Sequence, residues 1–575
     1  MKKLMLGNEA VARGLYEAGC TFVSSYPGTP STEITEFAGT YDEIYAEWAT
    51  NEKVATESAF GACVAGARSF SAMKHVGMNV AADLLFTAAY TGVNGGYIMA
   101  VADDQGMHSS QNEQDSRHYA ISAKVPMLEP ADSQECKDFV KLGYEISEEY
   151  DTPVLLRLTT RISHSQSSVT MGDRVEVPLK AHEKNPAKYV MMPGNAKKRH
   201  PIVEERTLKL VDLANSDKVN KVIMGDTKIG IVAAGIAYQY AKEAFGDQAS
   251  YLKLNMINPL PTDLLKDFAS KVDALYIIEE LDDIIETHVK KLGIACKGKE
   301  LFSLIGEYTP EMIRTAITGE AASEKLSADA APIRPPVLCP GCPHRGLFYV
   351  LNKLKLTVSG DIGCYTLGAT APLNAMDSTI DMGASVTILH GMNKVRGEET
   401  ARKSVAVIGD STFMHSGITG LVNVVYNNTP STIIIVDNYI TGMTGHQQNP
   451  TTGKNLKMQE APQVDLEALC RAVGVNRVTV VDPYDLARTE AVLKEELVAD
   501  EPSVIIARRP CALLKHVKHS APLKIDADKC KKCRACMKIG CPAISFVKGY
   551  AEIDISLCNG CGLCKDLCKF GCIEG

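Results

Sequence analysis

The sequence lacks an excess of positive charge. Its 575 residues include 61 lysines and arginines against 69 aspartates and glutamates, which gives a formal net charge of −8. A chain without an overall basic field has little to hold a phosphate backbone. We therefore expect no nucleic acid among its principal partners, and small molecules as its substrates.

Long apolar runs are also missing. No stretch approaches the roughly 18 consecutive apolar residues of a membrane-spanning helix, and the apolar start of the chain stops at Gly7, Asn8 and Glu9. We expect neither a membrane span nor a signal peptide, and a cytoplasmic location. In that reducing compartment, closely spaced cysteines are more often metal ligands than disulfides.

The overall composition is ordinary for a globular protein, with 45% hydrophobic and 23% charged residues. Helical patterns such as residues 7–18 alternate with strand-like apolar runs such as residues 97–102 and 229–234. We therefore predict an α/β fold. At about 150 residues per domain, a chain of this length should hold three or four domains.

Polar and proline-rich segments indicate where the domains meet. A polar stretch at residues 185–206 and an Ala/Ser/Pro-rich stretch at residues 321–336 are predicted linkers. The predicted domains are three α/β domains at residues 1–185, 206–320 and 337–515, and a small cysteine-rich domain at residues 521–575.

Nine of the 18 cysteines fall within residues 530–572. Short C-x2-C-x2-C spacing lets one loop place three thiolates around one iron–sulfur cubane, while a fourth cysteine farther along reaches the neighbouring cluster. Structural zinc is the alternative for paired C-x2-C sites. The two runs are Cys530-x2-Cys533-x2-Cys536-x4-Cys541-Pro542 and Cys558-x2-Cys561-x2-Cys564-x3-Cys568.

This pattern resembles the bacterial two-cluster ferredoxins. It departs from them in the x4 spacing before Cys541 and in Lys569, which stands where proline is usual. Cys572 is left without a role. The resemblance implies one 4Fe-4S cluster on Cys530, Cys533, Cys536 and Cys568, and a second on Cys541, Cys558, Cys561 and Cys564.

Two strand-like runs farther upstream end in polar residues. Residues 405–408 lead into Gly409-Asp410-Ser411, and residues 432–436 end at Asp437-Asn438, 28 residues after Asp410. Such strand ends can meet at the carboxyl edge of a parallel sheet, where α/β folds bind ligands. Carboxylate and amide oxygens there suit Mg²⁺ with a diphosphate. The alternative is an acidic turn in an ordinary α/β domain.

The spacing resembles the GDG-to-NN motif of thiamine diphosphate enzymes, with Ser411 in place of the third glycine and Asp437 in place of the first asparagine. The resemblance implies that Gly409, Asp410 and Ser411 contact thiamine diphosphate. It also implies that Asp410, Asn438 and the backbone carbonyl of Ile440 hold Mg²⁺.

Four more cysteines resemble a cluster site of the 2-oxoacid:ferredoxin oxidoreductases. In that family a C-P-G-C motif and a later G-I-G-C motif help to hold a cluster beside thiamine, and a cysteine after a late strand can complete the set. The resemblance offers a third cluster, with ordinary buried cysteines as the alternative. The matching residues are Cys339, Cys342, Cys364 and Cys511.

Motifs near the N-terminus resemble the same family. Tyr26-Pro27-Gly28-Thr29-Pro30 is similar to its Y-P-x-T-P loop, which implies that Tyr26 and Thr29 contact the cofactor. Glu52, nine residues before Gly61, resembles the glutamate that hydrogen-bonds the aminopyrimidine ring. A buried carboxylate can exchange a proton there. Glu57 is the competing choice, and a solvated helix face is the alternative for either.

Residues 74–79 and 103–112, with the order of all the motifs, resemble the large subunits of indolepyruvate:ferredoxin oxidoreductases. The resemblance implies oxidative decarboxylation of aryl pyruvates with CoA, giving aryl-acetyl-CoA, CO₂ and reduced ferredoxin, in a complex with a small second (beta) subunit. The alternatives are another 2-oxoacid as substrate, or an electron-transfer subunit with a vestigial thiamine site.

Overall fold

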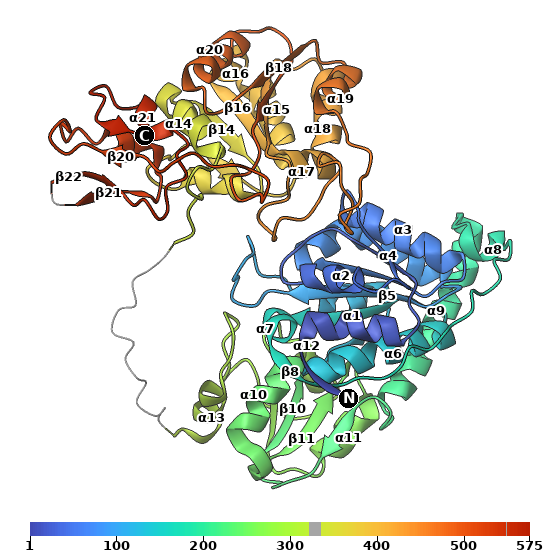
Figure 1. Ribbon diagram of the computed structural model, residues 1–575. Coiled ribbons are helices and arrows are strands. Elements are labelled where there is room, and N and C mark those ends of the chain that lie inside the picture. The colour runs from blue at the N-terminus through green and yellow to red at the C-terminus, as the bar shows by residue number, and fades with distance from the viewer. Residues whose placement is uncertain (321–334, 548) are drawn as a thin grey trace. The chain divides into compact units, whose positions relative to one another are not determined.

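A computed structural model describes residues 1–320, 335–547 and 549–575 of the protein (Figure 1). The chain divides into two units between residues 328 and 329. The linker predicted at 321–336 lies, except for its last two residues, outside the described residues. In the described parts of the chain, no helix has both the length and the apolar character needed to cross a membrane.

The first unit is built on a seven-stranded sheet in which β2 to β7 run parallel. The central strand β5 is buried along its whole length, as expected for a parallel strand with both faces covered. Helices α1 (Gly7–Glu17), α2 (Thr32–Ala38) and α6 (Ser133–Tyr150) pack together, and α3 (Glu52–Val64) packs on α4 (His75–Thr91). The strand order is β12 (Met256–Asn258), β6 (Met127–Leu128), β7 (Val154–Thr159), β5 (Tyr97–Asp103), β4 (Ser69–Lys74), β2 (Phe22–Ser25) and β3 (Tyr45–Trp48).

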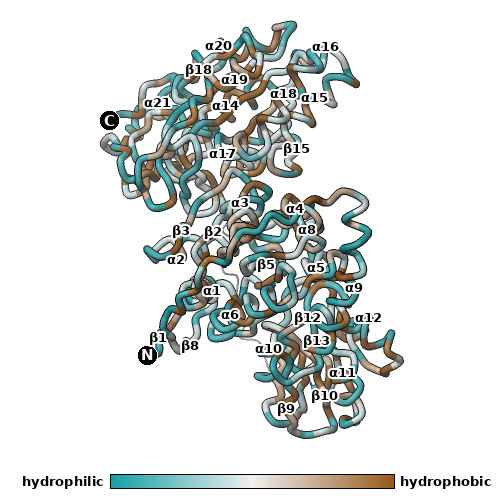
Figure 2. Tube along the Cα trace, turned by 90° about the vertical axis from the view of Figure 1, so that its right-hand side faces the viewer, coloured by the Kyte–Doolittle hydropathy of each residue, from teal (hydrophilic) through white to brown (hydrophobic). Residues whose placement is uncertain are grey.

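A four-stranded sheet also belongs to this unit, in the order β13 (Leu275–Ile278), β10 (Gly230–Ala234), β11 (Ser250–Leu254) and β9 (Lys221–Ile223). Hydrophobic segments run through the region of β10 and β13 (Figure 2), where every strand residue is buried. Strand β12 follows β11 in the sequence but pairs with β6 of the seven-stranded sheet. One hydrophobic core runs through both segments, so they form a single unit.

The linker predicted at residues 185–206 is wrong, because this segment is mainly helical. It forms α8 (Pro186–Tyr189) and most of α9 (Pro193–Ala214). Arg206 donates from Nη2 to the Ala89 carbonyl, and Arg199 donates from Nε to the Tyr90 carbonyl, at 2.8 and 2.6 Å. These carbonyls belong to the last turn of α4, where carbonyl groups have no hydrogen-bond partners within their own helix. Helix α9 is therefore attached by these arginines as well as by its buried apolar residues Val203, Leu210 and Ala214.

The second unit contains a six-stranded parallel sheet with helices on both faces. Along β16, Val405 and Val407 join the core that includes α14 (His344–Leu354) and α20 (Leu486–Glu496), whereas Ala406 and Ile408 join the core of α15 (Ala384–Arg396), α18 (Ile418–Tyr426) and α19 (Leu466–Val473). The strand order is β15 (Ser378–Thr379), β14 (Thr357–Gly360), β16 (Ser404–Gly409), β17 (Thr432–Asp437), β19 (Ser503–Arg508) and β18 (Arg477–Val481).

The cysteine-rich tail packs on the same unit through Tyr349 and Leu486. It contains two short antiparallel pairs and little other regular structure. The pairs are β20 (Lys524–Ile525) with β23 (Ile573–Glu574), and β21 (Ile544–Val547) with β22 (Tyr550–Ile553). The α/β class is confirmed, as are the strands predicted near residues 97, 229, 405 and 432.

Candidate cofactor sites

Asp410 and Asn438 lie at the carboxyl edge of the sheet in the second unit. They follow β16 and β17, which are parallel neighbours, so the two strand ends meet as the sequence predicts. Both side chains are buried. Asp410 Oδ2 accepts a hydrogen bond from Thr451 Oγ1 at 3.1 Å, and Asn438 Oδ1 accepts one from the Ile440 amide at 3.2 Å. An acid, an amide and the backbone turn after Asn438 thus lie at neighbouring strand ends.

The charges at this edge favour a cation. Burial, together with the neighbouring carboxyl of Asp437, raises the pKa of Asp410 to about 7. Within the described residues, Asp437 Oδ1 has no hydrogen-bond partner, although Oδ2 accepts from Arg508 Nε at 2.8 Å. A divalent ion would stabilise the ionised form of Asp410. The oxygen donors of Asp410, Asn438 and Ile440 fit Mg²⁺, which prefers such ligands.

The departures from the thiamine motif are accommodated locally. Ser411 is buried, and its hydroxyl accepts from Thr441 Oγ1 at 2.9 Å, so it joins the loop that follows Asn438. Gly409 ends β16 with no space for a side chain, because a Cβ there would lie 2.6 Å from Cε1 of Tyr365. Ser411 is therefore accommodated, through its contact with Thr441, at a position where the motif has glycine.

The cysteines proposed for a third cluster come together from distant parts of the sequence. Cys339 and Cys342 precede α14, Cys364 follows β14, and Cys511 follows β19. Burial raises the pKa of the Cys364 thiol to about 11, and the neighbouring thiols of Cys511 and Cys339 add to this shift. Burial also raises the pKa of Cys342, with contributions from Cys364 and Cys339. Such thiols need a bound metal to become thiolates.

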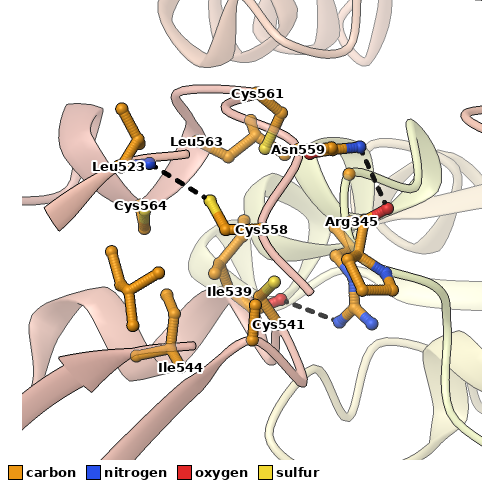
Figure 3. A pocket seen from close by; sticks show the side chains of 14 residues that line it. Arg345, Leu523, Ile539, Cys541, Ile544, Cys558, Asn559, Cys561, Leu563 and Cys564 are labelled. Carbon is orange, nitrogen blue, oxygen red and sulfur yellow. Dashed lines mark hydrogen bonds between the residues drawn. The ribbon is translucent and has the colours of Figure 1, made fainter. Parts of the chain in front are cut away.

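In the tail, one cavity is surrounded by Cys541, Cys558, Cys561 and Cys564, the four residues expected to share the second cluster (Figure 3). Its other walls are mainly apolar. The Cys558 sulfur accepts hydrogen bonds from the backbone amides of Leu523 and Gly560, both at 3.4 Å. Amide donors of this kind stabilise sulfur ligands of iron clusters.

A separate cavity is lined by Cys530, Cys533, Cys536 and Cys568, the residues expected to share the first cluster. Cys568 thus lies with the triplet that precedes it by some thirty residues, and Cys541 lies with the triplet that follows it. Cys572 lines the same cavity as Cys568. Within the described residues, no three His, Cys, Asp or Glu side chains are placed to hold a single metal ion. A cubane binds its thiolates through four separate irons, which is a different geometry.

The N-terminal motifs meet at the carboxyl edge of the first unit's sheet. Glu52 begins α3 and is 4% exposed, and it lies over Gly77, where an added Cβ would come 2.7 Å from Glu52 Oε1. Tyr26 is also buried, and the Thr29 carbonyl accepts from Ser109 Oγ at 3.4 Å. Glu57 instead forms an exposed ion pair with Lys53. Of the two candidate glutamates, only Glu52 is enclosed.

The sequence analysis assigns no role to several polar residues near these sites. Burial lowers the pKa of the Lys74 ammonium, and the carboxylates of Asp104 and Glu52 oppose the shift. His344 follows the Cys-Pro-Gly-Cys-Pro motif, and burial lowers its pKa to about 4. Lys74 is the last residue of β4, Asp104 directly follows β5, and His344 directly follows the cysteine motif. That position is the signal that could have identified them.

Comparison with known proteins identifies the family. Residues 13–221 match the family described as "Pyruvate flavodoxin/ferredoxin oxidoreductase, thiamine diP-bdg", and residues 361–507 match "Thiamine pyrophosphate enzyme, C-terminal TPP binding domain". The chain is 41% identical to "Indolepyruvate oxidoreductase subunit IorA" of Archaeoglobus fulgidus over 99% of this chain and 96% of that protein. The Pyrococcus horikoshii protein of the same name is 39% identical, over 100% and 97%.

The chain belongs to the IorA family of indolepyruvate oxidoreductase subunits. Membership makes it a subunit of a thiamine diphosphate-dependent oxidoreductase, since both matched domains are thiamine-binding types. Among solved structures, a 2-oxoglutarate:ferredoxin oxidoreductase from Magnetococcus marinus is 18% identical to this IorA-family chain, with a TM-score of 0.48 over 55% of this chain and 65% of that one.

Proposed function

We propose that this chain, with a smaller second subunit, catalyses the oxidative decarboxylation of aryl pyruvates such as indolepyruvate in the cytoplasm. In the proposed reaction, a 2-oxoacid, CoA and two oxidised ferredoxins give the acyl-CoA, CO₂, two reduced ferredoxins and a proton. One observation carries the proposal. A single unit contains a buried acid and amide at the carboxyl edge of its sheet, placed as in the thiamine motif, and three groups of four cysteines. The names of its relatives, over nearly the full chain, point to indolepyruvate.

The proposed roles rest on the resemblance to thiamine diphosphate enzymes, and the burial of Asp410, Asn438 and Glu52 supports them. Asp410, Asn438 and the Ile440 carbonyl would hold Mg²⁺ and through it the diphosphate. Thiamine diphosphate, when bound, supplies a nucleophilic carbon and an electron sink for the 2-oxoacid. Glu52 would exchange a proton with the aminopyrimidine ring, and its enclosure excludes water from that proton.

The cysteine groups would provide the path for electrons. Cys339, Cys342, Cys364 and Cys511 would hold the cluster in the thiamine domain, and the two sets in the tail would hold the outer clusters. A ferredoxin would collect the electrons one at a time. The subunit names of the relatives support a heteromeric complex, because a protein named subunit IorA is one part of an assembly.

The test uses the anaerobically purified complex with indolepyruvate. We expect the visible iron–sulfur absorption to bleach, and CoA to accelerate the bleaching. A panel with branched-chain 2-oxoacids and 2-oxoglutarate measures the preference for the aryl group. If indolepyruvate causes no bleaching in a sample shown to contain thiamine and iron, the substrate assignment is wrong.

A further inference from the structure

Five cysteines, not four, line the cavity proposed for the first tail cluster. Cys572 lies with Cys530, Cys533, Cys536 and Cys568, and its sulfur is 3.3 Å from the sulfur of Cys568. A cubane takes four protein thiolates. One sulfur of this close pair is therefore surplus to the ligand set.

The position of Cys572 is fixed by the fold of the tail. Its carbonyl accepts from the Asp526 amide at 2.8 Å, and the next residue, Ile573, pairs with Ile525 in the β20–β23 ladder. Cys572 is only 5% exposed. The short ladder therefore holds the thiol against Cys568 and leaves it little freedom to turn to solvent.

Cys572 lies outside the four-thiolate ligand set, and a buried cysteine that binds no metal is ordinarily a neutral thiol. Ile525, Phe546 and Phe570 line the same cavity, together with two charged residues, Lys531 and Arg534. A neutral thiol is a hydrogen-bond donor, and a ligating thiolate is an acceptor. Among the described residues that line the second tail cavity, the cysteines are the four of its predicted set, with no fifth. The two tail sites therefore differ by one sulfur donor.

We propose that Cys572 does not ligate iron but donates an S–H···S hydrogen bond to Cys568, and so raises the reduction potential of the first tail cluster. The inference rests on the clusters of the proposed function. Reduction adds one electron to the cluster and moves no proton, and part of the added negative charge falls on the ligating sulfurs. A donor to such a sulfur stabilises the reduced state more than the oxidised state.

The experiment is an anaerobic redox titration of the whole complex, followed by electron paramagnetic resonance, on the native protein and on Cys572→Ala. We expect one reduced-cluster signal to move to a lower potential. A hydrogen bond of ordinary net strength corresponds to about a two- to tenfold change in the reduction equilibrium, and tenfold is about 59 mV for one electron. The iron and sulfide content should stay at the native value.

Two variants serve as controls. Cys572→Ser keeps a donor at the same place, so its signal should lie between those of the native protein and Cys572→Ala. Cys470→Ala removes a fully buried thiol on α19, outside every cysteine group, and should leave all potentials unchanged. If Cys572→Ala folds poorly, Cys572→Ser still reports the shift.

Other outcomes would overturn the inference. Unchanged potentials in Cys572→Ala would refute the hydrogen bond. Loss of one cluster from Cys572→Ala, with that cluster retained in Cys568→Ala, would make Cys572 the ligand. Native protein without iron in the tail would refute both this inference and the proposed electron path. An iron-loaded protein that is inactive on indolepyruvate would refute only the substrate assignment.

Discussion

Nδ2 of Asn438 lies 3.4 Å from Nε2 of His344. An amide nitrogen can only donate, so the histidine nitrogen accepts, and burial keeps the ring neutral by lowering its pKa to about 4. The contact turns the amide so that Oδ1 is the atom available to a metal. His344 directly follows the loop with Cys339 and Cys342. One side chain thus connects the cysteine loop to a proposed Mg²⁺ ligand.

This contact predicts that His344 supports metal binding without touching the metal. His344→Phe removes the acceptor and frees the Asn438 amide to rotate. Loss of such outer partners typically costs about ten- to hundredfold in metal affinity. His344→Gln keeps an acceptor and should bind nearly normally. Calorimetric titration of cofactor-free protein with Mg²⁺ and thiamine diphosphate measures the effect, and equal affinities for all three proteins would contradict it.

The raised pKa of Asp410 predicts how the stability of metal-free protein changes with pH. Its folded pKa of about 7 exceeds the ordinary value of 3.8, so the folded state binds a proton more tightly than the unfolded state. The free energy of unfolding should therefore fall as pH rises from about 4 to about 7. Asp410→Asn should weaken this dependence. Denaturant midpoints across that range, with and without Mg²⁺, measure it.

Saturating Mg²⁺ provides the matching arm of that experiment. A bound cation lowers the pKa of Asp410 in the folded state. The free energy of unfolding should then stay high at pH values above the ordinary pKa and fall only as the pH becomes acidic. Mg²⁺ should thus protect the native protein most at the alkaline end of the range. If Mg²⁺ stabilises Asp410→Asn as strongly as the native protein, the metal binds elsewhere.

Much of the second unit could be predicted because its signals are local. Residues 404–409 and 432–437 are continuous apolar runs that end in polar residues, and parallel strands place such ends together. The cysteine grouping in the tail follows from the resemblance to two-cluster ferredoxins, and the two tail cavities have the same grouping. Helix α9 is harder to predict, because its few buried apolar residues lie among charged ones, and Arg199 and Arg206 bind carbonyl groups of α4. The pairing of β12 with β6 could not be predicted, because it depends on residues far apart in sequence.

Buried ion pairs of Arg117 reach the end of β13 in the first unit, and they predict a large stability effect. Arg117 donates to Asp115 at 2.6 Å and to Glu279, at the end of β13, at 2.5 Å, and all three are buried. Arg117→Met would leave two buried carboxyls without their cation, a change that typically costs about 3–5 kcal/mol. Chemical unfolding of the chain measures the loss.

An exposed pair gives the control for that variant. Arg161, whose side chain is 53% exposed, pairs with Glu307 at 2.6 Å. Surface pairs are typically worth about 0–1 kcal/mol, so Arg161→Gln should change stability little. Equal losses for Arg117→Met and Arg161→Gln would show that burial of the Arg117 network adds nothing.

The enclosure of Glu52 predicts a catalytic effect that Glu57 does not share. Glu52→Gln keeps the shape of the side chain but removes the exchangeable proton, and general acid–base groups typically contribute about 10²- to 10⁴-fold to rate. Glu57→Gln, on the exposed face of the same helix, should leave turnover unchanged. Indolepyruvate-dependent ferredoxin reduction, with thiamine content measured in parallel, separates lost catalysis from lost binding. Full activity of Glu52→Gln would refute its role.

Arg345 connects two of the cysteine groups through the backbone. Its Nε donates to the Cys339 carbonyl at 3.0 Å, and its Nη1 donates to the Ile539 carbonyl at 3.3 Å and to that of Gly540. Burial lowers the pKa of this guanidinium, and the thiols of Cys541 and Cys342 oppose the shift. The cation therefore lies between the cysteine loop before α14 and the tail, beside the cavity in Figure 3.

A lysine cannot reproduce these contacts, because its single ammonium does not span both segments. Arg345→Lys should leave several buried carbonyls without donors and loosen the tail from α14. We expect faster hydrogen exchange of the amides near residues 539 and 540 and faster proteolysis of residues 515–523, while thiamine binding at Asp410 stays intact. Lys353→Arg, at an exposed pair with Glu490 on α14 and α20, is the control. Unchanged exchange in Arg345→Lys would show that apolar packing alone holds the tail, and that the guanidinium contributes charge rather than attachment.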